Sequence, residues 1–285
     1  MSIAFVLSGG ASLGAVQVGM LQALAERGIQ PDMVLGASVG AVNAGWVAGD
    51  PTLSNLDDLR SIWTSLRTRD VFPLRPLSGL LGFVGRRDAL VPATGLRALL
   101  TRHLRFERLE DAAIPLLVVA TELTSGREIV LRTGNAVDAV LASAAVPGVF
   151  PPVPIDGRTL VDGGIVNNTP ISHAVGAGAS PIYVLPTGYA CALERAPTSA
   201  LAVMLQAIAL LIQQRLATEA HSLRGRVDLR VIPPLCPLAV SPADFSRADE
   251  LIDRAYEATC RWLADEAAHA ARDQSLDLAF HDHAT

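Results

Sequence analysis

The residues Gly36-Ala37-Ser38-Val39-Gly40 match the Gly-x-Ser-x-Gly pattern, which presents a serine hydroxyl as a nucleophile. The pattern follows an apolar run at 33–37, expected to be a strand, and precedes a small apolar stretch at 39–47, expected to be a helix. Glycines two positions before and after Ser38 remove the side chains that would collide in so sharp a turn. The helix N-terminus also favours developing negative charge. We therefore predict that Ser38 is a nucleophile; a serine that only caps the helix is the alternative.

A second glycine-rich turn, Gly9-Gly10-Ala11-Ser12-Leu13-Gly14, joins the first expected strand to the first expected helix. Such turns expose backbone N–H groups that bind anions. The dinucleotide fingerprint would need glycine at position 11, and the phosphate-binding loop would need lysine at position 15; alanine occupies both. Neighbouring βα units of a parallel sheet bring their loops side by side. We therefore expect the amides of Gly9, Gly10 and Ala11 to form an oxyanion hole facing Ser38, with a purely structural turn as the alternative.

An acidic residue, Asp162, stands at the end of an expected strand and is followed by Gly163 and Gly164. Alone, this pattern is typical of an Asx turn. In a chain that also has a serine elbow, it makes Asp162 the candidate general base.

The six histidines provide no motif for a Ser-His-Asp triad. We expect each of them to be a satisfied or solvated side chain: His103, His173, His221 and His269 on helices, and His281 and His283 in the tail. The position of the serine also differs from the common α/β-hydrolase fold, because Ser38 follows only the second strand. Asp162 therefore remains the candidate base for Ser38.

Periodicity indicates a three-layer α/β/α sandwich with a mainly parallel central sheet. The first 50 residues read as strand, helix, strand, helix, which predicts right-handed crossovers between parallel strands. We find no repeat, linker or domain boundary, so residues 1–272 are expected to form one domain and 273–285 a polar tail. Strands are predicted at 3–7, 33–37, 115–122, 127–131, 153–155, 159–161, 182–185 and 229–232, and helices at 12–27, 39–47, 53–66, 94–104, 136–144, from 170, 199–221 and 246–272.

Composition limits the partners that this chain of 285 residues can be expected to have. Half of its residues are hydrophobic and the net charge is −5, which does not suggest a nucleic-acid partner. The widely spaced Cys191, Cys236 and Cys260 indicate neither a zinc site nor a disulfide framework. No signal peptide is evident, and the apolar stretch 199–212 is shorter than a membrane span. We therefore expect a cytoplasmic protein.

Taken together, these segments resemble the patatin-like phospholipase family. The resemblance rests on four motifs in order: 7–14, Gly36 to Gly40, 142–152 (Ala-Ser-Ala-Ala-Val-Pro-Gly-Val-Phe-Pro-Pro), and Asp162-Gly163-Gly164 with Asn167-Asn168. It implies a patatin-like fold, a Ser–Asp dyad, an oxyanion hole in the first glycine-rich loop and hydrolysis of acyl esters in phospholipids or related lipids. It implies no metal and no organic cofactor.

Two residues depart from the family pattern, which usually has glycine at position 11 and a basic residue at position 13. Here they are Ala11 and Leu13, so backbone donors remain but the cation is absent. An acyltransferase or thioesterase using the same dyad, or a lipid-binding protein without activity, are the alternative functions. Head group, chain length and oligomeric state are not indicated.

An apolar, proline- and glycine-rich segment at 71–85 is flanked by arginines. It is expected either to cap the core or to cover Ser38 and touch a lipid surface peripherally.

Overall fold

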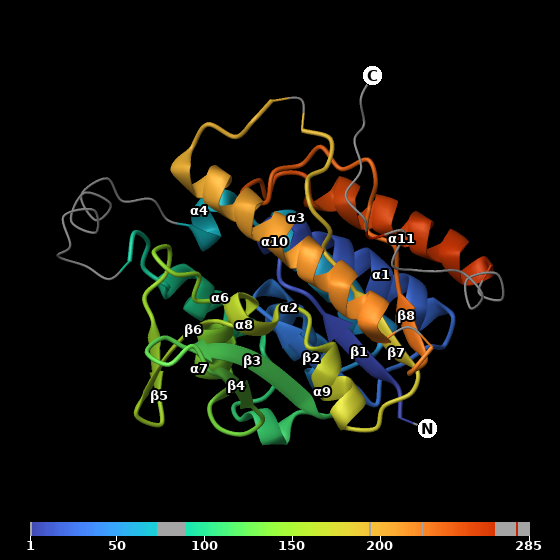
Figure 1. Cartoon of the computed structure of the whole chain (residues 1–285), viewed down its shortest axis with the longest axis horizontal. Helices are drawn as coiled ribbons and strands as arrows, with labels where there is room; N and C mark the ends of the chain where they lie inside the picture. The colour runs from blue at the N-terminus through green and yellow to red at the C-terminus, as the bar shows by residue number, and fades with distance from the viewer. Residues whose placement is uncertain (1, 73–88, 194, 224, 266–277, 279–285) are drawn as a thin grey trace.

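A computed structural model describes residues 2–72, 89–193, 195–223, 225–265 and 278. They form one sheet with helices on both faces (Figure 1). The strands are β1 (Ala4–Leu7), β2 (Met33–Ala37), β3 (Leu116–Glu122), β4 (Glu128–Leu131), β5 (Val153–Ile155), β6 (Arg158–Asp162), β7 (Ile182–Leu185) and β8 (Leu229–Val231). The α-helices are α1 (Ala15–Glu26), α2 (Val39–Gly49), α3 (Leu53–Ser65), α4 (Thr68–Val71), α6 (Thr94–His103), α7 (Ala136–Ser143), α8 (Gly164–Asn167), α9 (Ile171–Gly176), α10 (Ala200–Leu223) and α11 (Ala248–Ala264). Two short 3₁₀ helices are η1 (Ala11–Gly14) and η2 (Leu109–Asp111).

The sheet has the order β5-β6-β3-β2-β1-β7-β8, with β4 paired to β3 beside this path. The pairs from β3 through β8 along this order are parallel, whereas β4, β5 and β6 make antiparallel pairs. The fold is therefore an α/β fold with a mainly parallel sheet, as the sequence predicts. The antiparallel strands are all at the β3 end of the sheet.

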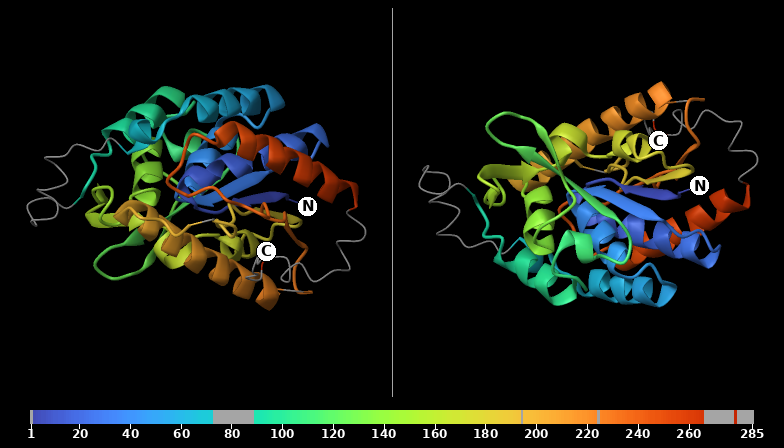
Figure 2. Two further views of the ribbon diagram at one scale, coloured as in Figure 1. Left: turned by 90° about the horizontal axis from the view of Figure 1, so that it is seen from above. Right: turned by 90° about the horizontal axis from the view of Figure 1, so that it is seen from below.

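Side chains of the central strands alternate between two hydrophobic clusters, because successive residues of a strand point to opposite faces. In β1, Phe5 and Leu7 belong to the larger cluster, whereas Ala4 and Val6 belong to the smaller one. The larger cluster is completed by α1, α2, α3, α6, α7 and α11, and the smaller by α9 and α10. Figure 2 shows the sheet between these two helical layers, so the three-layer prediction is confirmed.

The element bounds differ from the predicted ones mainly at helix ends. The strands at 33–37 and 182–185 have the predicted limits, while the first predicted helix begins as η1 before α1. The last predicted helix is α11 up to Ala264, and its predicted continuation lies outside the described residues. Leu278, in the predicted polar tail, is buried, and its carbonyl accepts a hydrogen bond from Gln213.

Helix α10 is the one described helix whose length and composition would suit a membrane span. It is longer than the apolar stretch that the sequence suggested. In the fold it packs along the sheet through Leu205, Ala209, Ile212, Leu216 and Ala220. Only 28 % of its most apolar 18-residue stretch is buried, so much of its apolar surface faces outward. Figure 1 shows α10 crossing one face of the molecule.

Candidate active site

Ser38 occupies a tight turn between β2 and α2. Its backbone has φ 54° and ψ −129°, a left-handed conformation that is uncommon outside glycine. The turn needs Gly40 because a Cβ atom there would lie 2.2 Å from the carbonyl oxygen of Leu7, and Gly36 because its Cβ would lie 2.4 Å from the oxygen of Gly40. Strain of this kind is typical of functional residues, and here it projects the serine hydroxyl from the sheet.

Asp162, the last residue of β6, accepts a hydrogen bond from the Ser38 hydroxyl. The distance from Ser38 Oγ to Asp162 Oδ2 is 2.7 Å, and Asp162 Oδ1 accepts the N–H of Gly164 at 2.7 Å. The side chain is buried, with 6 % of the residue exposed. Burial raises the pKa of Asp162 to about 6, although the hydrogen bonds from Ser38 and Gly164 act in the opposite direction. The carboxyl is therefore a stronger base than an ordinary aspartate.

Strand β3 holds Ser38 and Asp162 at the same level of the sheet. It pairs with β2 in parallel, with Ala37 opposite Val119, and with β6 in antiparallel, with Asp162 opposite Ala120. Strands β2 and β6 thus reach the middle of β3 from opposite directions. A slip of one residue in the β6 register would turn Asp162 to the other face of the sheet, so this pairing fixes the contact between Ser38 and Asp162.

Ser143, at the end of α7, connects the nucleophile loop to the acid loop. Its carbonyl oxygen accepts the N–H of Ser38 at 3.1 Å and the N–H of Gly163 at 3.2 Å. Its hydroxyl also accepts from Ser38 N at 2.9 Å and donates to the carbonyl of Val119 at 2.5 Å. One residue therefore fixes both turns to each other and to β3.

The first glycine-rich loop lies beside the dyad, as expected. Gly10 and Ala11 line the same pocket as Ser38 and Asp162. In the described part of the chain, the N–H groups of these two residues donate to no protein oxygen, whereas the N–H of Gly9 donates to the carbonyl of Asn168 at 3.4 Å. Ala11 has φ 52°, so the missing third glycine does not prevent the left-handed turn. The structure thus leaves two amides of the loop available to an oxyanion, and Gly9 serves to position the loop.

Buried polar side chains hold this loop from behind. Thr187 donates its hydroxyl to the carbonyl of Gly9 at 2.8 Å, and its N–H donates to the hydroxyl of Ser8 at 2.9 Å. Gln17 donates its amide to the carbonyls of Ser8 and Leu185, and Asn43 donates to Gly14 and Gln17. Gly10 has no room for a side chain, since a Cβ would lie 2.2 Å from the hydroxyl oxygen of Thr187. Buried polar groups satisfied in this way specify one loop conformation.

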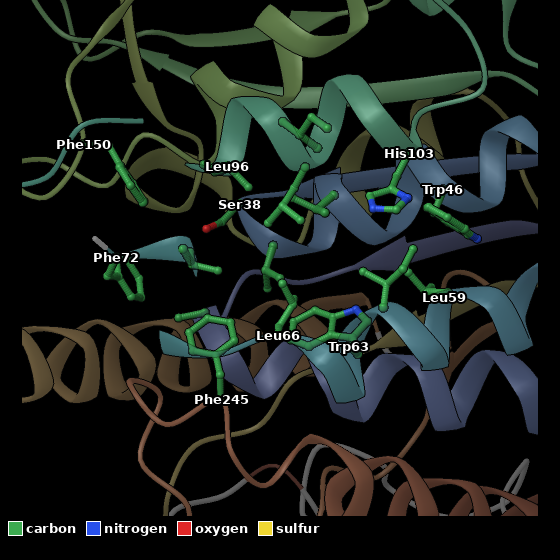
Figure 3. A pocket seen from close by; sticks show the side chains of 18 of the residues that line it. Ser38, Trp46, Leu59, Trp63, Leu66, Phe72, Leu96, His103, Phe150 and Phe245 are labelled. Carbon is green, nitrogen blue, oxygen red and sulfur yellow. The ribbon is translucent and has the colours of Figure 1, made fainter. Parts of the chain in front are cut away.

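Two pockets meet at Ser38. One is an apolar cavity of about 110 Å³, whose lining includes side chains from α2, α3 and α6 (Figure 3). The other, of about 390 Å³, is lined by Gly10, Asp162, Asn168 and the side of α10 that bears Leu205 and Arg215. A bound ester could therefore place one part in each pocket with its carbonyl at the serine.

The described histidines do not contact the dyad. His173 Nε2 lies within hydrogen-bonding distance of Glu128 Oε1, at 2.6 Å, and His221 is exposed. His103 lines the apolar cavity, a position that its helix periodicity did not reveal. His269, His281 and His283 lie outside the described residues. Within the part of the chain that the structure describes, no group of three or more His, Cys, Asp or Glu side chains could hold a metal ion.

The expected apolar cover at 71–85 lies outside the described residues from position 73 onward. Val71 and Phe72, its first two residues, are buried in the wall of the apolar cavity. Phe72 stacks on Phe150 with ring centroids 5.4 Å apart. The start of this segment is therefore part of the core.

Sequence reasoning missed the residues that position the site: Gln17, Asn43 and Thr187. Each is completely buried. For Gln17 and Asn43 a signal was available, because both interrupt otherwise apolar helices. Thr187 has no such signal, since its role depends on β7 lying next to β1.

Comparison with known proteins agrees with this geometry. The sequence model of the patatin-like phospholipase family matches residues 5–175. The chain is 30 % identical over 189 residues to patatin-like phospholipase domain-containing protein 7 of Rattus norvegicus, covering 66 % of this chain and 14 % of that protein. It is 32 % identical over 181 residues to an NTE family protein of Mycobacterium bovis, covering 62 % of this chain and 46 % of that protein. The chain thus matches less than half the length of either relative.

One solved structure supports the fold. VipD from Legionella pneumophila superposes with a TM-score of 0.51 at 17 % sequence identity, covering 92 % of this chain and 67 % of that chain. At this identity the likeness concerns the fold alone.

Proposed function

Because the chain belongs to the patatin-like phospholipase family, we propose that it hydrolyses acyl ester bonds of phospholipids or related lipids through the Ser38–Asp162 dyad. Family membership supports lipid acyl hydrolase activity in general. The observation that carries the finer proposal is the 2.7 Å hydrogen bond from a strained serine to a buried carboxylate whose pKa is raised to about 6. Since the relatives are much longer proteins, the proposal concerns this domain.

In the first half of the reaction, Ser38 Oγ attacks the ester carbonyl while its proton moves to Asp162 Oδ2. The negative charge on the former carbonyl oxygen is stabilised by the N–H groups of Gly10 and Ala11, with the N-terminus of α2 nearby. Asp162, now a carboxylic acid, donates its proton to the alkoxide as the bond to the leaving group breaks. The product of this half is an acyl ester on Ser38.

In the second half, water enters the wider pocket and Asp162 accepts one of its protons. The hydroxide attacks the acyl ester, and the charge again develops toward Gly10 and Ala11. Ser38 leaves with the proton from Asp162, which releases the fatty acid. A carboxyl with a pKa of about 6 suits both roles, because it is ionised at neutral pH and is still acidic enough to return the proton.

The two pockets suggest how a lipid is placed. The apolar cavity matches an acyl chain, and the wider pocket matches the alcohol part, since it contains Asp162, Asn168 and Arg215 besides apolar side chains. Both include Ser38, so the scissile carbonyl would lie at their junction.

The rim of the wider pocket is suited to a lipid surface. Ile165 and Leu211 line that pocket and are 53 % and 67 % exposed, and Val203 and Leu210 of α10 are also exposed. Exposed apolar side chains beside a pocket that contains the nucleophile fit a substrate drawn from an apolar layer. We therefore place the peripheral membrane contact here.

The proposal is tested with Ser38→Ala and Asp162→Asn on a soluble ester and on phospholipid vesicles. Losing the nucleophile should reduce the chemical step by on the order of a millionfold, and losing the base by roughly a thousandfold or more. A fluorophosphonate probe, mapped by mass spectrometry, should label Ser38 in the natural chain. His173→Ala is the control and should retain activity. Labelling of another serine, or a His173→Ala variant as inactive as Asp162→Asn, would contradict the dyad.

A further inference from the structure

We propose that the apolar cavity binds the acyl chain extended along α2, and that Trp46 and His103 close its far end. The enzyme would then prefer acyl groups of medium length. This inference rests on the proposed function and adds the class of acyl group to it. Figure 3 shows the arrangement: Ser38 lies at the start of α2, and Trp46 and His103 lie together farther along the cavity.

Helix α2 provides the floor of the cavity. Val39, Val42 and Trp46 all line it, and their spacing of three and four residues places them on one face of the helix. Ser38 directly precedes this helix, so the apolar face begins at the nucleophile. Helices α3 and α6 form the side walls, with Leu59, Ile62, Leu96, Leu99 and Leu100 among the lining side chains. The cavity is therefore a channel whose axis follows α2.

The length of this channel follows from helix geometry. Eight residues separate Ser38 from Trp46, which corresponds to about 12 Å along a helix axis. Tetrahedral carbons about 1.5 Å apart advance roughly 1.25 Å per bond in an extended chain. Helix side chains lean toward the N-terminus, so Trp46 reaches back toward Ser38 and shortens the channel. The cavity volume of about 110 Å³ is also less than the roughly 150 Å³ that holds benzene, so the channel holds on the order of six carbons at most.

The end of the channel is fixed in place. Trp46 Nε1 donates to the carbonyl of Asn55 at 2.8 Å, and the buried Asn55 side chain donates to the carbonyls of Asp50 and Trp46. The Trp46 ring also lies against His103, with centroids 5.8 Å apart and planes tilted by 48°. Burial lowers the pKa of His103, with a further contribution from Arg102, so a neutral imidazole faces the apolar chain at neutral pH. Because these contacts hold both rings in place, the pair should block a longer acyl chain and not move aside for it.

The test is a series of p-nitrophenyl esters from acetate to decanoate, each assayed below its solubility limit. In the natural chain, kcat/KM should rise roughly threefold to fourfold for each added methylene, as expected for burial of a methylene. It should peak near hexanoate and fall beyond.

Two substitutions should move this maximum in opposite directions. Val42→Phe fills the channel about halfway along, so the maximum should move to butanoate or shorter. Trp46→Ala opens the end, so the maximum should move to octanoate or longer, and His103→Ala should move it the same way. The decanoate-to-butanoate ratio should change at least tenfold between Val42→Phe and Trp46→Ala.

Trp262→Ala is the matched control, because it also removes a largely buried tryptophan, but from α11, outside the cavity lining. It should leave the position of the maximum unchanged even if the protein is destabilised. Unchanged maxima in both Val42→Phe and Trp46→Ala would overturn the inference while leaving the dyad intact, provided that ester cleavage still requires Ser38. Absence of Ser38-dependent cleavage of every ester by the natural chain would overturn the proposed function and this inference with it.

Discussion

In the proposed mechanism Asp162 has to be ionised to accept a proton, yet it is buried, and burial disfavours the charged form. Its pKa of about 6 predicts the pH dependence of the reaction. Below this value the carboxyl of the free enzyme is protonated and cannot act as base, so kcat/KM should fall tenfold per pH unit well below pH 6 and level off above pH 7. A pH profile with a soluble ester measures this. If kcat/KM instead begins to fall only near pH 4, Asp162 behaves as an ordinary exposed aspartate.

The same shift predicts an effect of Asp162 on stability. The folded chain binds this proton more tightly than the unfolded chain, whose aspartate has its ordinary pKa of 3.8. The contribution of Asp162 to the free energy of unfolding is therefore most favourable below pH 4 and is lost as the pH rises through 6. Full loss corresponds to about 3 kcal/mol, from 1.36 kcal/mol per pKa unit.

Asp162→Asn should therefore inactivate the protein and stabilise it at pH 8, by up to about 3 kcal/mol, because the amide carries no charge. At pH 4 the difference should largely vanish. Thermal or urea unfolding at both values checks this, with Asp156→Asn on an exposed turn as the control. A variant less stable than the natural chain at pH 8 would show that the carboxylate is well stabilised where it is.

At the scale of residues, the sequence predicted those whose roles depend on local motifs. Ser38 and Asp162 stand beside glycines that a sharp turn requires, and the structure brings them within hydrogen-bonding distance. The oxyanion loop was predicted as Gly9 to Ala11, but the N–H of Gly9 is already donated to Asn168. Whether a given amide is available depends on a partner 159 residues away, which no local pattern reveals.

At the scale of elements, the end of α7 determines how the nucleophile and acid loops are placed. Ser143→Ala removes the hydroxyl that accepts from Ser38 N and donates to Val119, but keeps the backbone carbonyl shared by both loops. We expect kcat to fall roughly tenfold with KM nearly unchanged, and stability to fall by about 1–3 kcal/mol.

Steady-state kinetics and urea unfolding separate these two effects. Ser61→Ala, an exposed serine on α3, is the control and should change neither. If Ser143→Ala keeps the kcat of the unsubstituted chain, the backbone carbonyl alone holds the turn.

The parallel half of the sheet could be predicted because strands and helices alternate along the chain, and this pattern admits few topologies. The hairpin of β5 and β6 was also visible from its Asp156-Gly157 turn. Its pairing with β3 was not, because an antiparallel strand can join either edge of a sheet. That pairing is what brings Asp162 to Ser38, so the sequence indicated the dyad without indicating its geometry.

At the scale of the whole molecule, the exposed rim of the wider pocket should matter only for aggregated lipid. Replacing Ile165 and Leu211 together by serine should lower activity on phospholipid vesicles at least tenfold, because less apolar surface can enter the lipid layer. Activity on a soluble butanoate ester should fall much less, and vesicle co-sedimentation should weaken.

Leu123→Ser is the matched control, since Leu123 is 51 % exposed on the turn after β3, outside both pocket linings. Equal losses on vesicles and on the soluble ester would instead mean that the rim shapes the pocket. A change of oligomeric state on gel filtration, with vesicle activity retained, would mean that the rim contacts a second copy of the chain.

Much of the wall of the apolar cavity is encoded apart from the reacting groups. Helices α3, α4 and α6 all lie between α2 and β3 in the sequence, whereas Asp162, Ser143 and the oxyanion loop lie outside that interval. Mutations between these two elements can therefore reshape one pocket while every codon of the dyad stays the same. Related proteins could thus acquire different acyl-chain preferences while they keep the same reacting residues. Their sequence differences would then be concentrated in this interval.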